Sequence, residues 1–463
     1  MSSGAVKSRA AADERYAPFW NEPFETMRWS DLEHWQAGQI AAMLPALRER
    51  SQMYAQLHAG LPGEPRMRSL ADLRELPFTL KDDIRAAQQG ATDAQPFGRN
   101  QAARLEDIVQ ALSSSGTTGQ PVHYAMTQPD VDVFTDAIAN TWYTAGVRRH
   151  DVVAHLVGLP MVAGGLPYAD GFRRIGATLC WLGGFPTDRI LREMRRLRAS
   201  VVLATTSFGL YLAEHWEAAG RDTGIGSALA KVLCGGEPGL NQPDVRARIE
   251  RGLGISHLRE AMGLGDVIPA MWGECDEHDG MHFNAQPHVA IELIDPASGE
   301  PVPWHEGASG EIVYTALARQ ATPLVRYRSR DHARVTGIGC ACGRTSPRIR
   351  CIGRTDDMLI YKGMNVFPTA VRDLITRRFA GSVEPLMRLW KEHAGQVRFD
   401  QPIAVDVETA PGFDPAQADG LRAAIEAEVR AQLQVRIAVT LLPAGSLPRS
   451  VYKNSLLAVR EAA

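Results

Sequence analysis

The 463-residue sequence lacks the features that mark several specialised classes of protein. No apolar run approaches the roughly 20 residues that cross a bilayer, and residues 1–7 contain no apolar segment of the signal-peptide type. The formal charge is only −3 and no basic tract stands out, so neither nucleic acid nor a membrane surface is expected as a partner. Six cysteines are too few for a disulfide framework in so long a chain, which favours a cytoplasmic location.

What the sequence does contain is typical of a globular protein with more than one domain. The hydrophobic and charged fractions, 45% and 22%, are ordinary, and the length suits two or three domains. Residues 29–60 and 67–90 have apolar positions at helical spacing, with Thr79 as the expected N-cap of a helix in the second stretch.

From about residue 105 the pattern alternates between strands and helices. Apolar runs at 152–157, 177–182, 201–205 and 231–234 end in Gly- or Ser-rich loops, which is typical of ligand-binding α/β sheets. Residues 287–335 indicate antiparallel strands, and a smaller region with two helices and two strands follows Gly353. We predict an α/β fold with a large N-terminal domain of mixed or parallel sheets and a β-rich subdomain, residues 1–353. A small α+β C-terminal domain is predicted at residues 354–463.

The run from Ser113 to Gly119 is a candidate phosphate-binding loop. Its glycines permit a tight backbone and close approach to a ligand. Its serines and threonines can offer N–H groups and hydroxyls to phosphate oxygens. It is not a Walker loop, because no Gly-Lys-Ser/Thr follows. On composition alone, a solvated Ser/Gly linker is an equally good interpretation.

The stretch from Ser114 to Pro121 resembles the phosphate-loop signature of adenylate-forming enzymes: acyl-CoA synthetases, peptide-synthetase adenylation domains and luciferases. The resemblance is closest to the phenylacetate–coenzyme A ligase branch and covers nearly the whole chain. Phe19-Trp20-Asn21 with Glu25-Thr26-Met27, and Leu76-Pro77-Phe78-Thr79 with Lys81, are similar to N-terminal features of that branch. The family's loop usually has a lysine where this chain has Gln120, so phosphate binding depends more on N–H and hydroxyl donors.

The resemblance implies a nucleotide site assembled from several motifs. The implied ATP-binding residues are Ser114, Ser115, Gly116, Thr117, Thr118, Gly119, Gly236, Glu237, Pro238, Met262, Gly263, Asp331 and Arg354. Asp331 would accept hydrogen bonds from the ribose hydroxyls. Met262 stands where an aromatic residue usually stacks on adenine, and Asp266 where a glutamate usually holds Mg²⁺. Asp266 is a sound oxygen ligand for Mg²⁺, although it is one methylene shorter. Standing alone, several of these motifs would be taken for plain turns.

The resemblance also implies the moving parts of the enzyme. Asp356 would be the pivot of a mobile C-terminal domain, and Lys362 and Gly363 would line the thiol tunnel after that domain rotates. Lys453 would bridge the substrate carboxylate and the α-phosphate, where a cation stabilises charge; Tyr452 replaces the glycine that usually precedes it.

The acid is expected between the predicted helix at 128–146, the loop 158–166 and the segment 205–208. The implied pocket residues are Tyr143, Val162, Gly164, Ser207 and Phe208, with Trp142, Leu159 and Met161 as further candidates for its wall. An apolar, partly aromatic wall without an obvious basic residue favours an aryl or arylacetic acid over a dicarboxylate.

Four residues form a candidate metal site. Cys340 and Cys342 lie in one turn, and Cys275 and His282 flank a polar turn upstream, with His278 as a competing ligand. A Cys₃His set suits tetrahedral Zn²⁺, and a closed set without an open position indicates a structural role. The alternative is two reduced surface thiols with unrelated upstream residues.

The leading hypothesis is an ATP-dependent aryl or arylacetic acid–coenzyme A ligase. It would use ATP, Mg²⁺ and coenzyme A, form an acyl-adenylate and release AMP and pyrophosphate. The expected partners are a small carboxylic acid and coenzyme A, with a homodimer as a possibility. An adenylating enzyme that does not use coenzyme A, and a lapsed nucleotide-binding protein, are the alternatives.

Overall fold

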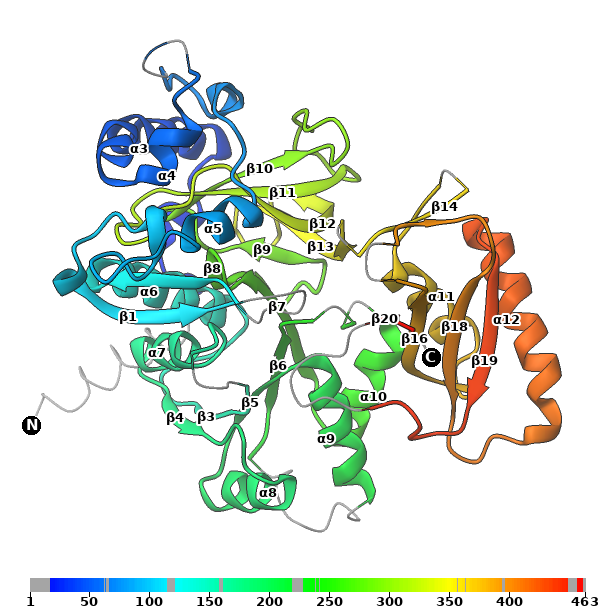
Figure 1. The fold of residues 1–463 in the computed structure, drawn as a ribbon. Helices are drawn as coiled ribbons and strands as arrows, with labels where there is room; N and C mark the ends of the chain where they lie inside the picture. The colour runs from blue at the N-terminus through cyan, green and yellow to red at the C-terminus, as the bar shows by residue number, and fades with distance from the viewer. Residues whose placement is uncertain are drawn as a thin grey trace, which may run out of the picture.

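The structure is a computed structural model that describes most of the chain. The described residues are 17–61, 63, 66–114, 121–157, 161–218, 228–237, 239–240, 242–355, 357–362, 364–393, 396–448 and 456–460. Its ribbon shows a large body that carries about the N-terminal three quarters and, beside it, a smaller α+β lobe (Figure 1).

The N-terminal helices are α2 (Glu22–Glu25), α3 (Trp29–Arg50), α4 (Gln52–Leu57) and α5 (Lys81–Gln88), with a 3₁₀ turn at Leu70–Glu75. The two helical stretches are thus confirmed, but the predicted cap was wrong. The N-cap of α5 is Leu80, whose N–H donates to Asp83. Thr79 instead bonds the carbonyl of Val325, because the chain runs beside β12 there before the helix begins.

The candidate phosphate loop joins two antiparallel strands, β1 (Ile108–Ser113) and β2 (His123–Thr127). Helix α6 (Gln128–Thr144) follows directly. Its N-terminus is fixed by the hydroxyl of Thr127, which accepts from Asp130 N, while the Asp130 carboxylate accepts from Thr127 N.

The main body is built on a single 11-stranded sheet with the order β10-β11-β12-β13-β9-β8-β7-β6-β5-β3-β4. One half is parallel: β3 (Val152–His155), β4 (Thr178–Trp181), β5 (Val201–Ala204), β6 (Lys231–Gly235) and β7 (His257–Leu264). These strands alternate with α7 (Leu166–Ile175), α8 (Thr187–Arg196), α9 (Thr206–Ala218) and α10 (Pro243–Leu253). The predicted alternation of strands and helices is therefore confirmed.

The other half of the sheet is antiparallel. It contains β8 (Ile268–Glu274), β9 (Met281–Phe283), β10 (Val289–Ile294), β11 (Ser309–Ala316), β12 (Tyr327–Ile338) and β13 (Pro347–Arg354). The β-rich region expected at 287–335 thus continues the parallel sheet, because β8 pairs with β7 as a hairpin.

After β13 the chain forms two small sheets, β14 (Leu359–Tyr361) with β15 (Met364–Val366) and β17 (Arg398–Phe399), and β16 (Val383–Lys391) with β18 (Ile403–Thr409), β19 (Ile437–Leu442) and β20 (Leu457–Val459). Helices α11 (Pro368–Arg378) and α12 (Ala418–Leu433) pack on them. This region has its own hydrophobic core, drawn from residues 359–439. Among the described helices none is long and apolar enough to cross a membrane.

Candidate active site

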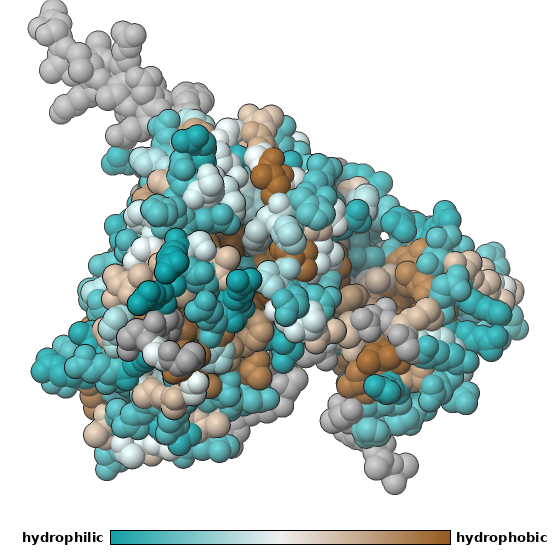
Figure 2. All heavy atoms as spheres, turned by 90° about the horizontal axis from the view of Figure 1, so that it is seen from above, coloured by the Kyte–Doolittle hydropathy of each residue, from teal (hydrophilic) through white to brown (hydrophobic). Residues whose placement is uncertain are grey.

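A cavity of about 1370 Å³ runs along the carboxyl ends of the parallel strands and under the smaller lobe. Its walls come from both parts of the molecule: Ser114, Met262 and Asp331 from the large body, and Met387 and Leu457 from the lobe. Seen from above, the two parts meet across a notch where apolar side chains reach the surface (Figure 2). Such a position, at the carboxyl edge of an α/β sheet, is where ligands bind in this class of fold.

The base of the predicted phosphate loop forms one end of the cavity. Ser114 N donates to the carbonyl of Val122 (2.9 Å), and Val122 N donates to Ser114 Oγ (3.2 Å), so the two ends of the loop are pinned together. Ser113 N donates to the carbonyl of Met161, which brings the loop 161–166 alongside. The predicted residues Ser115, Gly116, Thr117, Thr118 and Gly119 lie outside the described residues, as do Pro238, Asp356, Gly363 and Lys453.

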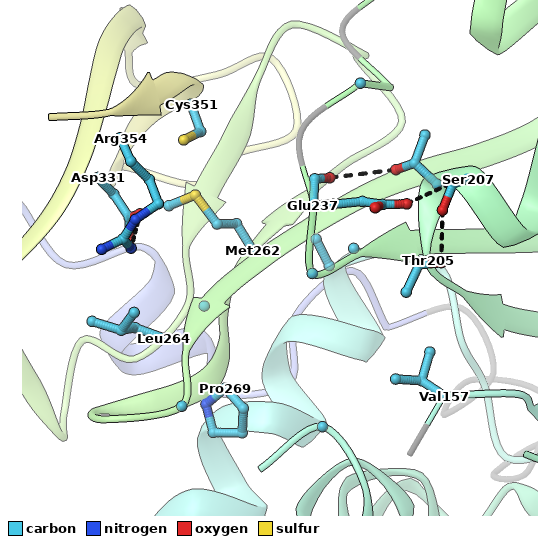
Figure 3. A pocket seen from close by; sticks show the side chains of 18 of the residues that line it. Val157, Thr205, Ser207, Glu237, Met262, Leu264, Pro269, Asp331, Cys351 and Arg354 are labelled. Carbon is cyan, nitrogen blue, oxygen red and sulfur yellow. Dashed lines mark hydrogen bonds and ion pairs between the residues drawn. The ribbon is translucent and has the colours of Figure 1, made fainter. Parts of the chain in front are cut away.

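The residues expected around the nucleotide line the middle of the cavity (Figure 3). Asp331 and Arg354 point toward one another on paired strands, with 3.3 Å between Oδ1 and Nη1. Met262 extends from β7 toward them. Gly263 admits no side chain, because a Cβ there would overlap the backbone of Pro269 and lie 2.5 Å from Ala270 N.

Glu237 fixes the opposite wall of the cavity. Its carboxylate accepts from Ser207 N at 2.5 Å, at the first turn of α9, and its neighbour Gly236 has a φ of +82° that favours glycine. A carboxylate at a helix N-terminus is favourable because the N–H groups there have no partner within the helix. Glu237 therefore ties the turn after β6 to the segment that carries Ser207 and Phe208.

Asp266, the predicted Mg²⁺ ligand, faces the cavity from the β7–β8 turn but is almost completely buried. Its carboxylate accepts from Tyr124 Oη and lies 3.1 and 3.3 Å from Lys81 Nζ. Its backbone carbonyl accepts from the buried guanidinium of Arg319. An oxygen donor held in this way at the phosphate end of the cavity fits Mg²⁺.

The acid end of the cavity is apolar and aromatic. Val162, Gly164, Ser207 and Phe208 line it as expected, together with Trp142, Val157 and Tyr168. Tyr143 is not among the described residues that line it. Consecutive residues of a helix project about 100° apart, so Trp142 faces the cavity while Tyr143 donates its hydroxyl to the carbonyl of Ala17 and packs under Arg148.

The sequence motifs did not identify Glu260, which also lines the cavity. Burial raises the pKa of its carboxyl to about 7, helped by the neighbouring Glu274 and opposed by Arg350 and Arg246. Glu260 lies two residues before Met262 on β7, so the alternation of a strand places both on one face. The alternation along this strand is the sequence feature from which Glu260 could have been predicted to share a face with Met262.

The smaller lobe contributes the end of its chain to the cavity. Leu456 and Leu457, just after the segment with Lys453, line it. Lys362 lies at the tip of the β14–β15 hairpin, beside the ring of Tyr361, and is not among the described residues that line the cavity.

The four predicted metal ligands converge. Cys275 follows β8, His282 is in β9, and Cys340 and Cys342 lie in the β12–β13 loop; their ligand atoms all lie within 4.8 Å of one another. The sulfurs of Cys275 and Cys340 are 3.8 Å apart, and Cys342 Sγ is 3.4 Å from His282 Nε2. Tetrahedral Zn²⁺ with ordinary bond lengths would separate such pairs by about 3.8 and 3.6 Å. The donor set and its spacing fit zinc.

The surroundings of the cluster are closed. His282 Nδ1 lies 3.3 Å from Ser346 Oγ, a contact that can orient the ring. Arg344 donates to Cys342 Sγ and forms a buried ion pair with Glu25 at 2.7 Å. The β12–β13 loop is thereby fastened to the N-terminal segment that resembles the phenylacetate–coenzyme A ligase branch.

Comparison with known proteins agrees with this geometry. The family model for AMP-binding enzymes matches residues 40–316, and the model for the C-terminal domain of AMP-binding enzymes matches residues 363–458. Phenylacetate-coenzyme A ligase of Thermus thermophilus is 31% identical over 445 residues, covering 92% of this chain and 96% of the relative. The Escherichia coli enzyme of that name is 32% identical over 359 residues, covering 77% and 78%.

Among solved structures, 2-hydroxyisobutyryl-CoA ligase in the postadenylation state, in complex with 2-HIB-AMP, has the same fold. The TM-score is 0.85 at 24% identity, with 96% of this chain and 93% of that chain covered. The predicted α/β architecture and the predicted class, an AMP-forming acid–thiol ligase, are confirmed. The chain belongs to the AMP-binding enzyme family, and both of these relatives are named phenylacetate-coenzyme A ligase.

Proposed function

We propose that this chain is an ATP-dependent aryl or arylacetic acid–coenzyme A ligase. One observation carries the proposal: a single cavity joins the phosphate-loop base at Ser114, the Asp331–Arg354 pair and an apolar pocket walled by Trp142 and Phe208. An acid in that pocket lies beside a nucleotide that spans the other two sites. The relatives named phenylacetate-coenzyme A ligase support the same assignment.

In the first half-reaction an oxygen of the acid attacks the α-phosphorus of ATP and pyrophosphate leaves. Asp331 holds the ribose hydroxyls, and Met262 and Gly263 cover the adenine. Mg²⁺, when bound at Asp266, neutralises charge on the phosphates. Lys453 stabilises the charge that develops between the carboxylate and the α-phosphate. These residues mainly position the substrates and stabilise charge, since the chemistry needs no covalent intermediate on the protein.

In the second half-reaction the thiol of coenzyme A attacks the acyl carbonyl and AMP leaves. The division into residues 1–353 and a mobile domain of residues 354–463 belongs to this proposal. Its support is the separate core of the smaller lobe and the position of Leu457 at the cavity while Lys362 lies elsewhere. Rotation about Asp356 would exchange the two segments, and such a step can limit turnover.

The walls of the acid pocket support the substrate class. They include the rings of Trp142, Tyr168 and Phe208, and the hydroxyl of Tyr168 donates a hydrogen bond to the carbonyl of Pro269. No cation is among the described residues at this end of the cavity, so a second carboxylate on the acid would be buried without a partner.

The four-residue cluster is proposed to hold a structural Zn²⁺. The bound ion would join the β8–β9 region to the β12–β13 loop. Because three thiolates and one imidazole leave a net negative charge around a divalent ion, Arg344 supplies the compensating cation.

A pyrophosphate-release screen over phenylacetate, benzoate, substituted arylacetates and succinate tests the function, with and without coenzyme A. We expect release with arylacetates and consumption of coenzyme A in equal amount, with succinate at background. Release without any consumption of coenzyme A would instead favour the adenylating enzyme that the departures at Met262 and Asp266 first suggested.

A further inference from the structure

The phosphate end of the cavity has an unusual distribution of charge. Between Ser113 and Pro121 the sequence contains no lysine or arginine. A nucleotide triphosphate carries several negative charges, which enzymes neutralise with cationic side chains as well as metal ions. Lys453 is proposed to act at the α-phosphate, so a cationic side chain that joins Mg²⁺ at the β- and γ-phosphates would have to come from outside the loop.

The cations among the described lining residues are Lys81, Arg85, Arg328, Arg330, Arg354 and Arg372. Four of the arginines form ion pairs with carboxylates that are not expected to contact the phosphates. The pairs are Arg85 with Asp82, Arg328 with Glu311, Arg354 with the proposed ribose ligand Asp331, and Arg372 with Asp373. Arg330 lies 3.9 Å from Glu311. Lys81 differs, because its partner is Asp266, the carboxylate at the phosphate end.

Lys81 lies where its charge is unfavourable for the helix but available to a ligand in the cavity. Lys81 is the first residue of α5, and a cation is unfavourable at a helix N-terminus. Its side chain is 30% exposed and lines the cavity with Ser113 and Ser114, whereas that of Asp266 is only 4% exposed. The ammonium group is thus held at the surface of the cavity by a carboxylate that is itself fixed by Tyr124.

We propose that Lys81 binds the phosphate chain of the nucleotide and supplies the charge that the loop does not carry. The proposal rests on the proposed function in taking ATP as the ligand. Asp266 then has two roles, since it orients Lys81 and is the predicted ligand of Mg²⁺.

Binding of ATP and of AMP to Lys81→Met, measured by calorimetry in the presence of Mg²⁺, tests the proposal. Losing a charge-assisted contact to the β- or γ-phosphate should weaken ATP binding by about 10- to 100-fold. AMP lacks those phosphates, so its affinity should change less than about 3-fold. Lys81→Arg should retain ATP binding, and Lys81→Gln, which can still donate to Asp266, should show the selective loss.

Lys231→Met is the matched control, because Lys231 forms a similar pair with Asp151 at 2.7 Å outside the cavity. It should leave the ratio of ATP to AMP affinity unchanged. Equal weakening of ATP and AMP in Lys81→Met would overturn the proposal and leave Lys81 as a counter-ion of Asp266.

The readout separates this proposal from the proposed function. If wild type binds ATP but no acid in the screen supports pyrophosphate release, the ligase assignment fails. The comparison of ATP with AMP still decides the role of Lys81.

Discussion

The Cys₃His cluster and the cavity both gather polar side chains from distant parts of the chain, but they hold them differently. In the cluster every ligand faces its partners, and Arg344, Glu25 and Ser346 close the outside. In the cavity, Lys81, Asp266, Asp331 and Arg354 pair with one another while facing open space. The first arrangement would be complete with the proposed metal, whereas the second consists of pairs that a ligand can rearrange.

This difference suggests separate roles: the cluster contributes to stability and the cavity to binding. The cluster fastens the β12–β13 loop at one end of the strands that carry Asp331 and Arg354 at their other end. A closed cluster can therefore keep Asp331 and Arg354 in register without lining the cavity itself. Its loss should affect folding first, and changes in the cavity should affect binding first.

Breaking the cluster is expected to have the largest effect. Cys342→Ser removes one thiolate and leaves Arg344 without its sulfur acceptor. Metal content should fall from about one zinc per chain to near zero, and the free energy of unfolding should fall by more than about 3 kcal/mol, because binding energy of a structural ion is folding energy. Metal analysis and urea unfolding measure both.

Cys180→Ser is the control, since Cys180 lies in the edge strand β4, away from the cluster. It should keep the metal. A wild-type protein that contains no zinc and gains no stability from added zinc would contradict the assignment and leave the four residues as reduced side chains.

Much of this organisation could be predicted from the sequence because motifs fix residue types. The glycine at 263, where no Cβ fits, and the four residues of the Cys₃His cluster, which the structure brings together, were predicted in this way. Local motifs do not settle positions where tertiary packing decides direction. The choice between Trp142 and Tyr143 depends on helix phase, and the cap of α5 depends on the contact of Thr79 with β12. The pair between Lys81 and Asp266 spans 185 residues, so no local pattern could indicate it.

A second substitution tests how closely the cavity wall is packed. Gly263→Ala places a methyl group against the backbone of Pro269 and Ala270, which cannot rotate away as a side chain could. The β7–β8 hairpin must shift, and we expect a loss of about 2–4 kcal/mol of stability together with weaker AMP binding. Urea unfolding and calorimetry measure these effects.

Gly265→Ala provides the comparison for that substitution. Its added methyl would meet only the Cβ of Ala163, at 3.2 Å, so a loss below about 1 kcal/mol is expected. Equal effects of the two substitutions would show that the wall is loosely packed.

The smallest expected effect concerns Glu260, which belongs to the cavity but behaves like a buried residue. Its folded-state pKa, raised by burial to about 7 from 4.5, means that the folded protein binds a proton more tightly than the unfolded chain does. The contribution of Glu260 to stability is therefore fully present below about pH 4.5 and is lost as the pH rises to about 7. Arg350 and Arg246 reduce this loss, and Glu274 and Asp373 increase it.

Between pH 5 and pH 8, wild type should lose roughly 1–2 kcal/mol more stability than Glu260→Gln, as measured by urea unfolding. Parallel pH profiles for the two proteins would show that Arg350 and Arg246 hold the Glu260 carboxylate ionised throughout.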